Sequence, residues 1–169
     1  MQLDCRMLKP QDAEMFRPLR LAALQEFPND FESSHDAESR MLVPELQQLM
    51  QQHAIVGGFL NGQLKGFAII DAVRLQRIAH RARISSVYIA ADVRHTGAAE
   101  SMMGWILKEF GRFFTLYRLG VRSDNEVAIK FFKKMGFQEI GVEPRAMVVA
   151  QDESGNREYV DEMQMYLAT

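Results

Sequence analysis

An Asn61-Gly62 pair lies between two apolar runs, and it constrains the fold of this chain more than any other short feature. The runs, at 54–60 and 64–73, are rich in apolar and β-branched side chains. Asn-Gly favours a two-residue turn in which both residues take a positive φ, and this turn joins adjacent antiparallel strands. We therefore expect a β-hairpin here, and a sheet built around it.

Apolar periodicity predicts further elements on both sides of this hairpin. Strands are expected at about 3–7, 81–90, 117–121, 137–149 and 159–167, and helices at about 11–26, 44–52, 97–114 and 126–135. Pro18 should kink the first helix or begin its second part. Ser123 and Glu126 have the spacing of a capping box for the last helix, and Gly136 is expected to end it.

The order of these elements predicts a mixed sheet. A right-handed crossover through the helix at 97–114 makes the strands before and after it parallel, inside a chain that is otherwise mostly antiparallel. We expect an α/β (α+β) fold with helices on both faces of the central sheet and one parallel strand pair. The length of 169 residues fits one domain, and no linker divides it, so we expect residues 1–169 to form a single domain.

Composition excludes several classes of protein. The net charge of −2 gives no basic excess of the kind that nucleic-acid binding usually needs. One cysteine forbids an internal disulfide and fits a reducing cytoplasm, and together with four scattered histidines it offers no metal-ligand spacing. No apolar run approaches the roughly 20 residues of a membrane span. We expect a cytoplasmic protein without metal, nucleic-acid or membrane partners.

The stretch from Val87 to Ala99 is the most informative for function. It is a strand and a short turn followed by small residues that open a long helix. Backbone N–H groups at such a helix start bind anions readily, and Gly97 lets a phosphate approach them closely. Arg94 adds a positive charge, although small residues here could also serve close packing alone. The Gly-rich phosphate loops of nucleotide triphosphatases and dinucleotide enzymes are absent.

Two segments together resemble the GNAT superfamily of acyl-CoA-dependent N-acetyltransferases. The family's Arg/Gln-x-x-Gly-x-Gly/Ala signature is matched by Arg94, Gly97 and Ala99. A later signature is matched by Asn125, Ala128, Phe131, Phe132, Gly136 and Phe137. The expected order of elements is also that of the family. The helix around Arg20 and the segments at 143–146 and 160–162 resemble one large branch whose acceptors are mostly unassigned.

The resemblance implies an enzyme that moves an acetyl group from acetyl-CoA to a primary amine by direct attack. The acyl-CoA would bind at the parallel strand pair. The backbone of Val87 and Ile89 would bind the pantetheine arm, and an amide near Ile89 would stabilise the oxyanion. The pyrophosphate would lie on the N–H groups of His95, Thr96, Gly97, Ala98 and Ala99, with Arg94 at the same mouth. Asn125 would bind the pantetheine or cap its helix, and Phe132 would also contact the cofactor.

The chain departs from the family at the groups that move protons. Phe132 stands where a tyrosine commonly protonates the departing thiolate. Tyr88 is our candidate for this acid, and Tyr117, Tyr159 and Tyr166 are other available hydroxyls. The strand at 82–89 has no carboxylate to act as the base. His80 could serve through a water molecule because its intrinsic pKa suits neutral pH, or it could be a surface imidazole.

Two further readings stay open. A catalytically weakened CoA-binding or sensor domain would keep the same cofactor residues, and the loss of the usual tyrosine favours it. An acidic stretch containing Asp30, Glu32 and Asp36 could attract a cationic amine or simply form a solvated loop. The acceptor amine is not readable from the sequence, and the C-terminal strands could pair across a homodimer.

Overall fold

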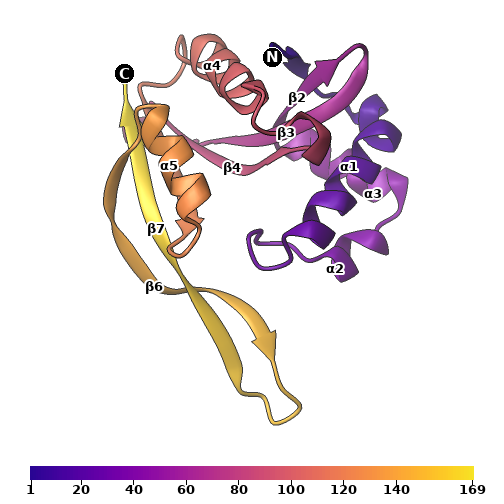
Figure 1. The fold of residues 1–169 in the computed structure, drawn as a ribbon, viewed down its shortest axis with the longest axis vertical. Helices are drawn as coiled ribbons and strands as arrows, with labels where there is room; N and C mark the ends of the chain where they lie inside the picture. The colour runs from indigo at the N-terminus through magenta and orange to yellow at the C-terminus, as the bar shows by residue number, and fades with distance from the viewer.

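A computed structural model describes residues 1–169, and it contains a seven-stranded sheet flanked by helices (Figure 1). The strands are β1 (Asp4–Met7), β2 (Ala54–Leu60), β3 (Gln63–Ala72), β4 (Arg81–Ile89), β5 (Leu116–Arg122), β6 (Gln138–Gln151) and β7 (Arg157–Ala168). The helices are α1 (Ala13–Glu26), α2 (His35–Ser39), α3 (Val43–Gln52), α4 (Ala98–Phe110) and α5 (Glu126–Lys134). Three short 3-10 turns are η1 (Pro10–Asp12), η2 (Gln76–Ile78) and η3 (Ala91–Val93). No helix is both long and apolar enough to cross a membrane.

The predicted hairpin is confirmed. β2 and β3 pair antiparallel, with Leu60 opposite Gln63 across the turn. Asn61 and Gly62 have φ angles of 50° and 79°, the left-handed conformation that this turn requires.

The predicted mixed sheet is confirmed as well. Across the sheet the strand order is β1-β2-β3-β4-β5-β7-β6, and only β4 and β5 pair in parallel. Helix α4 makes the crossover between these two strands. β7 lies between β5 and β6, so α5 carries the chain to the edge of the sheet before the β6–β7 hairpin returns it. The far end of that hairpin extends away from the rest of the molecule (Figure 1).

Apolar side chains form one core on each face of the sheet. A cluster of 18 buried residues lies under α4 and α5 and includes Met102, Ile106 and Phe132. A cluster of 11 lies under α1 and α3 and includes Phe16 and Leu46. Helices therefore cover both faces, as the sequence predicts.

Two predicted element boundaries are wrong. α4 ends at Phe110 rather than near residue 114, because the N–H groups of Phe113 and Phe114 both donate to the Phe110 carbonyl and form a turn. The cap of α5 is Asn125 rather than Ser123, since the Asn125 side chain accepts from the Ala128 N–H.

The N-terminal region also differs in detail from the prediction. α1 continues through Pro18, which has no N–H to donate to the preceding turn. The acidic stretch after α1 contains the short helix α2, whose N-cap Ser34 accepts from the Ala37 N–H.

Candidate active site

β4 and β5 stay together for only a short distance. Arg81 to Arg83 pair with Leu116 to Arg118, and no pairing follows towards the carboxyl ends of the strands. From Ile84 onward the edge of β4 that faces β5 has no strand partner, and the two strands separate. An edge of this kind can pair with an extended ligand through its backbone.

A bulge in β4 lies where the strands separate. Phe67 of β3 is opposite Tyr88, but Ile69 is opposite Ser85, so Ser86 and Val87 together face a single β3 residue. Ser86 has a φ of 51°, a left-handed conformation that is uncommon for a residue other than glycine. Such a bulge bends the strand and redirects its backbone groups, here at the mouth of the gap.

The turn before α4 faces the same gap. Gly97 is the N-cap of α4 with a φ of 89°, and it has no side chain to accept from the first N–H groups of the helix. His95 also lies in the left-handed region, with a φ of 61°. These N–H groups, together with the positive end of the helix dipole, favour an anion at this position.

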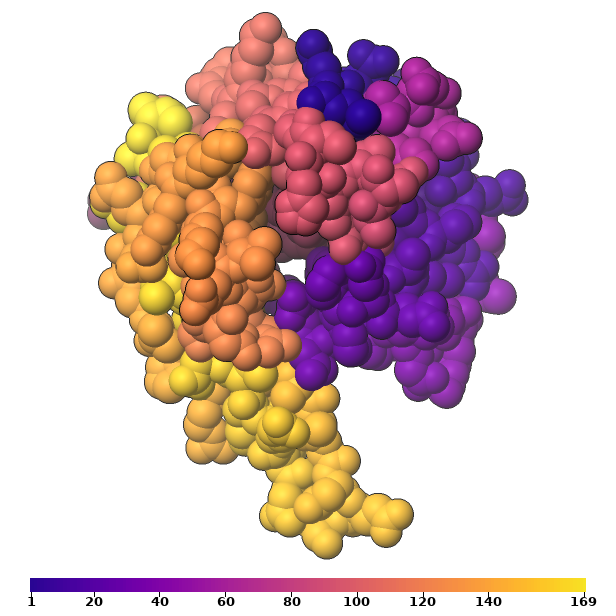
Figure 2. Space-filling view, viewed as in Figure 1, coloured from indigo at the N-terminus to yellow at the C-terminus, as the bar shows by residue number.

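The separation of the strands opens a cleft of about 720 Å³. Its walls come from the end of α1 and the loop after it, from β4, β5 and α5, and from the start of α4. Figure 2 shows the opening between the orange atoms of α5 and the purple atoms of the α1–α2 segment. The four cationic residues that line it are Arg94, Arg122, Lys130 and Lys134.

A family model described as the acetyltransferase (GNAT) family matches residues 19–137, which include β4, the α4 turn, β5 and all of α5. The chain belongs to the GNAT acetyltransferase family. The resemblance seen in the sequence is thereby confirmed, and membership makes the protein an acyltransferase by family.

Solved structures show the same fold. A GNAT acetyltransferase from Streptococcus pneumoniae has a TM-score of 0.78 and 20% identity, with 99% of this chain and 100% of that chain covered. A putative acetyltransferase from Salmonella typhimurium, solved with its cofactor acetyl-CoA, has a TM-score of 0.76 and 15% identity over 99% and 94%. A ribosomal-protein-alanine N-acetyltransferase from Brucella melitensis has a TM-score of 0.73 and 18% identity over 99% and 100%. No curated protein matches the sequence.

Most of the residues predicted to bind the cofactor of this GNAT protein line the cleft. They are Val87, Ile89, Arg94, His95, Ala99, Asn125 and Phe132. Thr96, Gly97 and Ala98 do not line it. The Thr96 hydroxyl donates to the Val93 carbonyl instead, and the Ala98 side chain is buried in the core under α4.

Arg94 holds β4 and α1 together rather than projecting freely into the cleft. Its guanidinium makes two hydrogen bonds to the Glu26 carboxylate, at 2.6 and 2.7 Å, and its Nε donates to the Ile89 carbonyl at 2.8 Å. It also lies over the rings of Phe27 and Tyr88. The positive charge is therefore at the cleft, but Glu26 balances it.

The two predicted catalytic side chains are placed differently from each other. Tyr88 lines the cleft, but its hydroxyl donates to Glu26 at 2.8 Å. Burial, with the nearby Glu26 carboxylate, raises the pKa of Tyr88 to about 12. His80 is exposed before the first residue of β4, at the end where β4 and β5 are paired, and it does not line the cleft.

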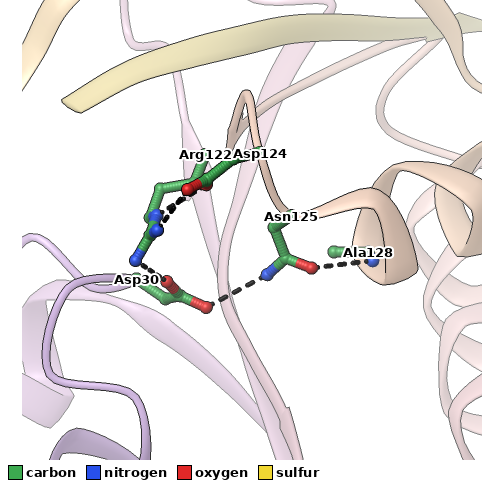
Figure 3. A network of polar contacts seen from close by, with 5 residues as sticks. All are labelled: Asp30, Arg122, Asp124, Asn125 and Ala128. Carbon is green, nitrogen blue, oxygen red and sulfur yellow. Dashed lines mark hydrogen bonds and ion pairs between the residues drawn. The ribbon is translucent and has the colours of Figure 1, made fainter.

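Asn125 belongs to a polar network that joins the two walls of the cleft (Figure 3). Its side-chain oxygen caps α5, which is one of the two roles predicted for it. Its side-chain amide donates to Asp30 at 3.0 Å. Asp30 also accepts from Arg122 at 3.1 Å, and Arg122 pairs with Asp124. This Asp30 clasp ties the α1–α2 loop to the start of α5.

Several cleft residues were not found from the sequence. Lys130 and Lys134 face the cleft from α5 and pair with Glu126 and Glu100. Their spacing of four residues, which places them on one side of a helix, is the signal that was available. Asp30 was noted only as part of an acidic stretch.

Phe132 lines the cleft while it packs against two other aromatic rings. The ring centroids of Phe131 and Phe137 lie 5.1 and 5.6 Å from that of Phe132. The residue is 6% exposed, so it supplies an apolar wall and no proton. Of the other candidate hydroxyls, Tyr117 is fully buried in the core, and Tyr159 and Tyr166 do not line the cleft.

Proposed function

We propose that this protein transfers an acetyl group from acetyl-CoA to a primary amine in the cleft between β4 and β5. The observation that carries this proposal is the early end of the β4–β5 pairing, after Arg83, which leaves a strand edge beside a helix start. An extended pantetheine arm adds to such an edge through backbone hydrogen bonds. The pyrophosphate would then lie on the first N–H groups of α4, next to His95 and Ala99.

The charge at the cleft supports a phosphate-bearing ligand. Lys130 and Lys134 lie on α5 across from the α4 turn, both in exposed positions where their ammonium groups can move towards a phosphate. Charge-assisted hydrogen bonds to phosphate are roughly twice as strong as neutral ones. Exposed ion pairs such as those with Glu126 and Glu100 are worth about 0–1 kcal/mol, so exchanging them for phosphate contacts costs little.

The chemistry in this proposal is direct attack. The amine nitrogen bonds to the thioester carbon, a backbone amide near Ile89 stabilises the oxyanion, and the carbon–sulfur bond then breaks. With Phe132 in the cleft, the thiolate takes its proton from solvent. A thiolate is a stable leaving group near neutral pH because the pKa of a free thiol is about 8.5. Losing a general acid costs about 10²–10⁴-fold in rate, so turnover should be slow but present.

The test begins with binding. Isothermal titration calorimetry with coenzyme A should give a measurable heat for the wild type. The variant A99D introduces a carboxylate where the pyrophosphate should lie. The helix itself should tolerate this change, because a negative charge in the first turn interacts favourably with the helix dipole. We expect at least about a tenfold loss of affinity, or 1.4 kcal/mol. The control A91D makes the same charge change at an exposed residue outside the cleft and should bind normally.

Turnover is then measured with acetyl-CoA and four acceptors: a peptide with an N-terminal alanine, a polyamine, a free amino acid and an aminoglycoside. Released CoA thiol and the mass of the acetylated amine are the two readouts. Binding of CoA without acetylation of any amine would favour the weakened or sensor domain. Absence of any binding by well-folded protein would overturn the proposal.

A further inference from the structure

The carboxylate of Glu162 lies beside a residue that lines the cleft, on a neighbouring strand. β7 pairs with β5, and Glu162 is opposite Arg122, while Gly120 is opposite Gln164. Met163 and Met165 pack into the core, so Glu162 and Gln164 lie on the other face of the sheet. Gly120 lines the cleft on this same face, and a Cβ atom there would overlap Oε2 of Glu162. The carboxylate thus occupies the space that a side chain at residue 120 would fill.

Glu162 has no cation in contact with it. The Gln164 amide donates to its Oε2 at 3.1 Å and also to Glu143 at 2.9 Å. Arg83 of β4 is the nearby cation, and it pairs with Glu32 of the α1–α2 loop. Partial burial is the main cause of the raised pKa of Glu162; the Gln164 amide and Arg83 oppose the rise, and Glu32 and Glu143 add to it.

The carboxylates that line the cleft, and that of Glu26 beside it, are already engaged by other groups. Asp30 accepts from Arg122 and Asn125. Glu100 pairs with Lys134. Glu26 is held by Arg94 and Tyr88. A carboxylate paired with a cation or held by several donors is a poor proton acceptor, because those partners stabilise its charged form. Glu162 makes no ion pair, and it lies next to Gly120, which lines the cleft.

We propose that Glu162 accepts the proton of the attacking amine, an inference that rests on the proposed function above. A protonated amine gives one proton to the Glu162 carboxylate, directly or through one water molecule, and the free amine then attacks the thioester carbon. The nitrogen–carbon bond forms, the carbon–sulfur bond breaks, and the second nitrogen proton leaves through solvent to the thiolate. The products are the amide and CoA, and Glu162 returns its proton to solvent.

The variant E162Q tests this assignment, with E143Q as the matched control. Both remove one carboxylate from the pair that shares the Gln164 amide, but only residue 162 lies over Gly120. We expect E162Q to lower kcat about 10²-fold and to remove the acidic limb of the kcat/KM profile. The dissociation constant for CoA should not change. E143Q should keep a kcat near that of the wild type.

A second variant distinguishes a loss of proton transfer from a loss of folded protein as the cause of a lower kcat. G120A retains the carboxylate but displaces it, because the new methyl group takes its space. We expect kcat to fall in G120A as well, with CoA binding intact. Carbon-13 NMR of the labelled glutamate carboxyls, assigned by the signal missing in E162Q, should show the Glu162 resonance titrating above the ordinary glutamate range.

The outcomes distinguish this inference from the proposed function. A wild type that binds no CoA or acetylates no amine overturns both. A wild type that turns over, with E162Q equally fast and its acidic limb unchanged, overturns only the role of Glu162. A fall in kcat that E143Q shows to the same extent also overturns it, because the effect would then belong to the shared hydrogen-bond network.

Discussion

Two aromatic residues at the cleft differ from each other in their capacity for proton transfer. Phe132 has no proton to give, and Tyr88 donates its own to Glu26, with a pKa of about 12. A hydroxyl with so high a pKa protonates a thiolate poorly, because the thiol formed is the stronger acid. We therefore expect Tyr88 to act mainly through its ring and its hydrogen bond, which connect β4 to the end of α1.

The variant Y88F tests this assignment. It keeps the ring against Phe67 and removes one hydrogen bond to a charged carboxylate, which Arg94 continues to balance. We expect the free energy of unfolding in urea to fall by about 1.5 kcal/mol. The basic limb of the pH profile for kcat should keep its position. A kcat lower by about 10²-fold in a normally folded Y88F would instead restore Tyr88 as the acid.

At the scale of single elements, the sequence predicted the structure wherever the conformational preference of neighbouring residues determines it. Asn61-Gly62 fixed the β2–β3 turn by its backbone preference. Helix ends were harder, because Ser123 and Asn125 are both good caps and only the actual hydrogen bond to Ala128 decides between them. The short helix α2 was missed because it has only five residues, too few to show an apolar period.

The cleft could be predicted only in part. The backbone positions around Val87 and Ala99 follow from a local motif, and both residues line the cleft. Glu162 and Asp30 could not be found this way. Each takes its place through a partner far away in sequence. The β5–β7 register brings Glu162 beside Gly120, and Asp30 contacts Arg122, 92 residues later. A single sequence contains no signal for such pairings.

A buried ion pair joins α1 to α2. Arg20 of α1 makes two hydrogen bonds to Glu38 of α2, at 2.9 and 2.7 Å, and the two side chains are only 8% and 9% exposed. The same guanidinium lies over the ring of Phe31, which lines the cleft. This pair thus fixes both α2 and the loop that forms one wall of the cleft.

We expect R20M to lower the free energy of unfolding by about 3–5 kcal/mol, because Glu38 would remain buried without a cation. Replacing both residues, R20M with E38M, should cost much less, since no buried charge is left unpaired. Urea denaturation of the wild type, the single variant and the double variant measures both effects. Equal losses in the single and double variants would show that packing, and not the unpaired charge, causes the loss.

At the scale of the whole molecule, the sheet consists of two parts that meet along a short seam. β1 to β4 form one part, and β5, β7 and β6 form the other, joined in the sheet by the three residue pairs between β4 and β5. The Asp30 clasp joins the two parts again beyond the cleft (Figure 3). The cleft therefore lies between the two places where these parts are joined, the β4–β5 pairing and the Asp30 clasp.

Acid should destabilise the whole molecule through carboxylates whose pKa lies below its ordinary value. They are Asp12, Glu26, Asp92, Glu100, Asp124, Glu126 and Asp152. A group with a lowered folded pKa stabilises the fold above its unfolded pKa and loses that contribution as pH falls through the folded value. The hydrogen bonds from Arg6 lower the pKa of Asp12 to about 2.

We therefore expect the melting temperature to fall between about pH 5 and pH 2, with a shallower fall in D12N, which lacks one of these titrating groups. D12N should be less stable than the wild type near neutral pH, because Arg6 and the Lys9 N–H lose their charged acceptor, and the difference should shrink as pH falls. The control E153Q removes a carboxylate that makes no ion pair, and its melting curve should follow that of the wild type. A difference between D12N and the wild type that stays constant down to pH 2 would contradict the linkage, because the loss would then come from packing that protonation does not change.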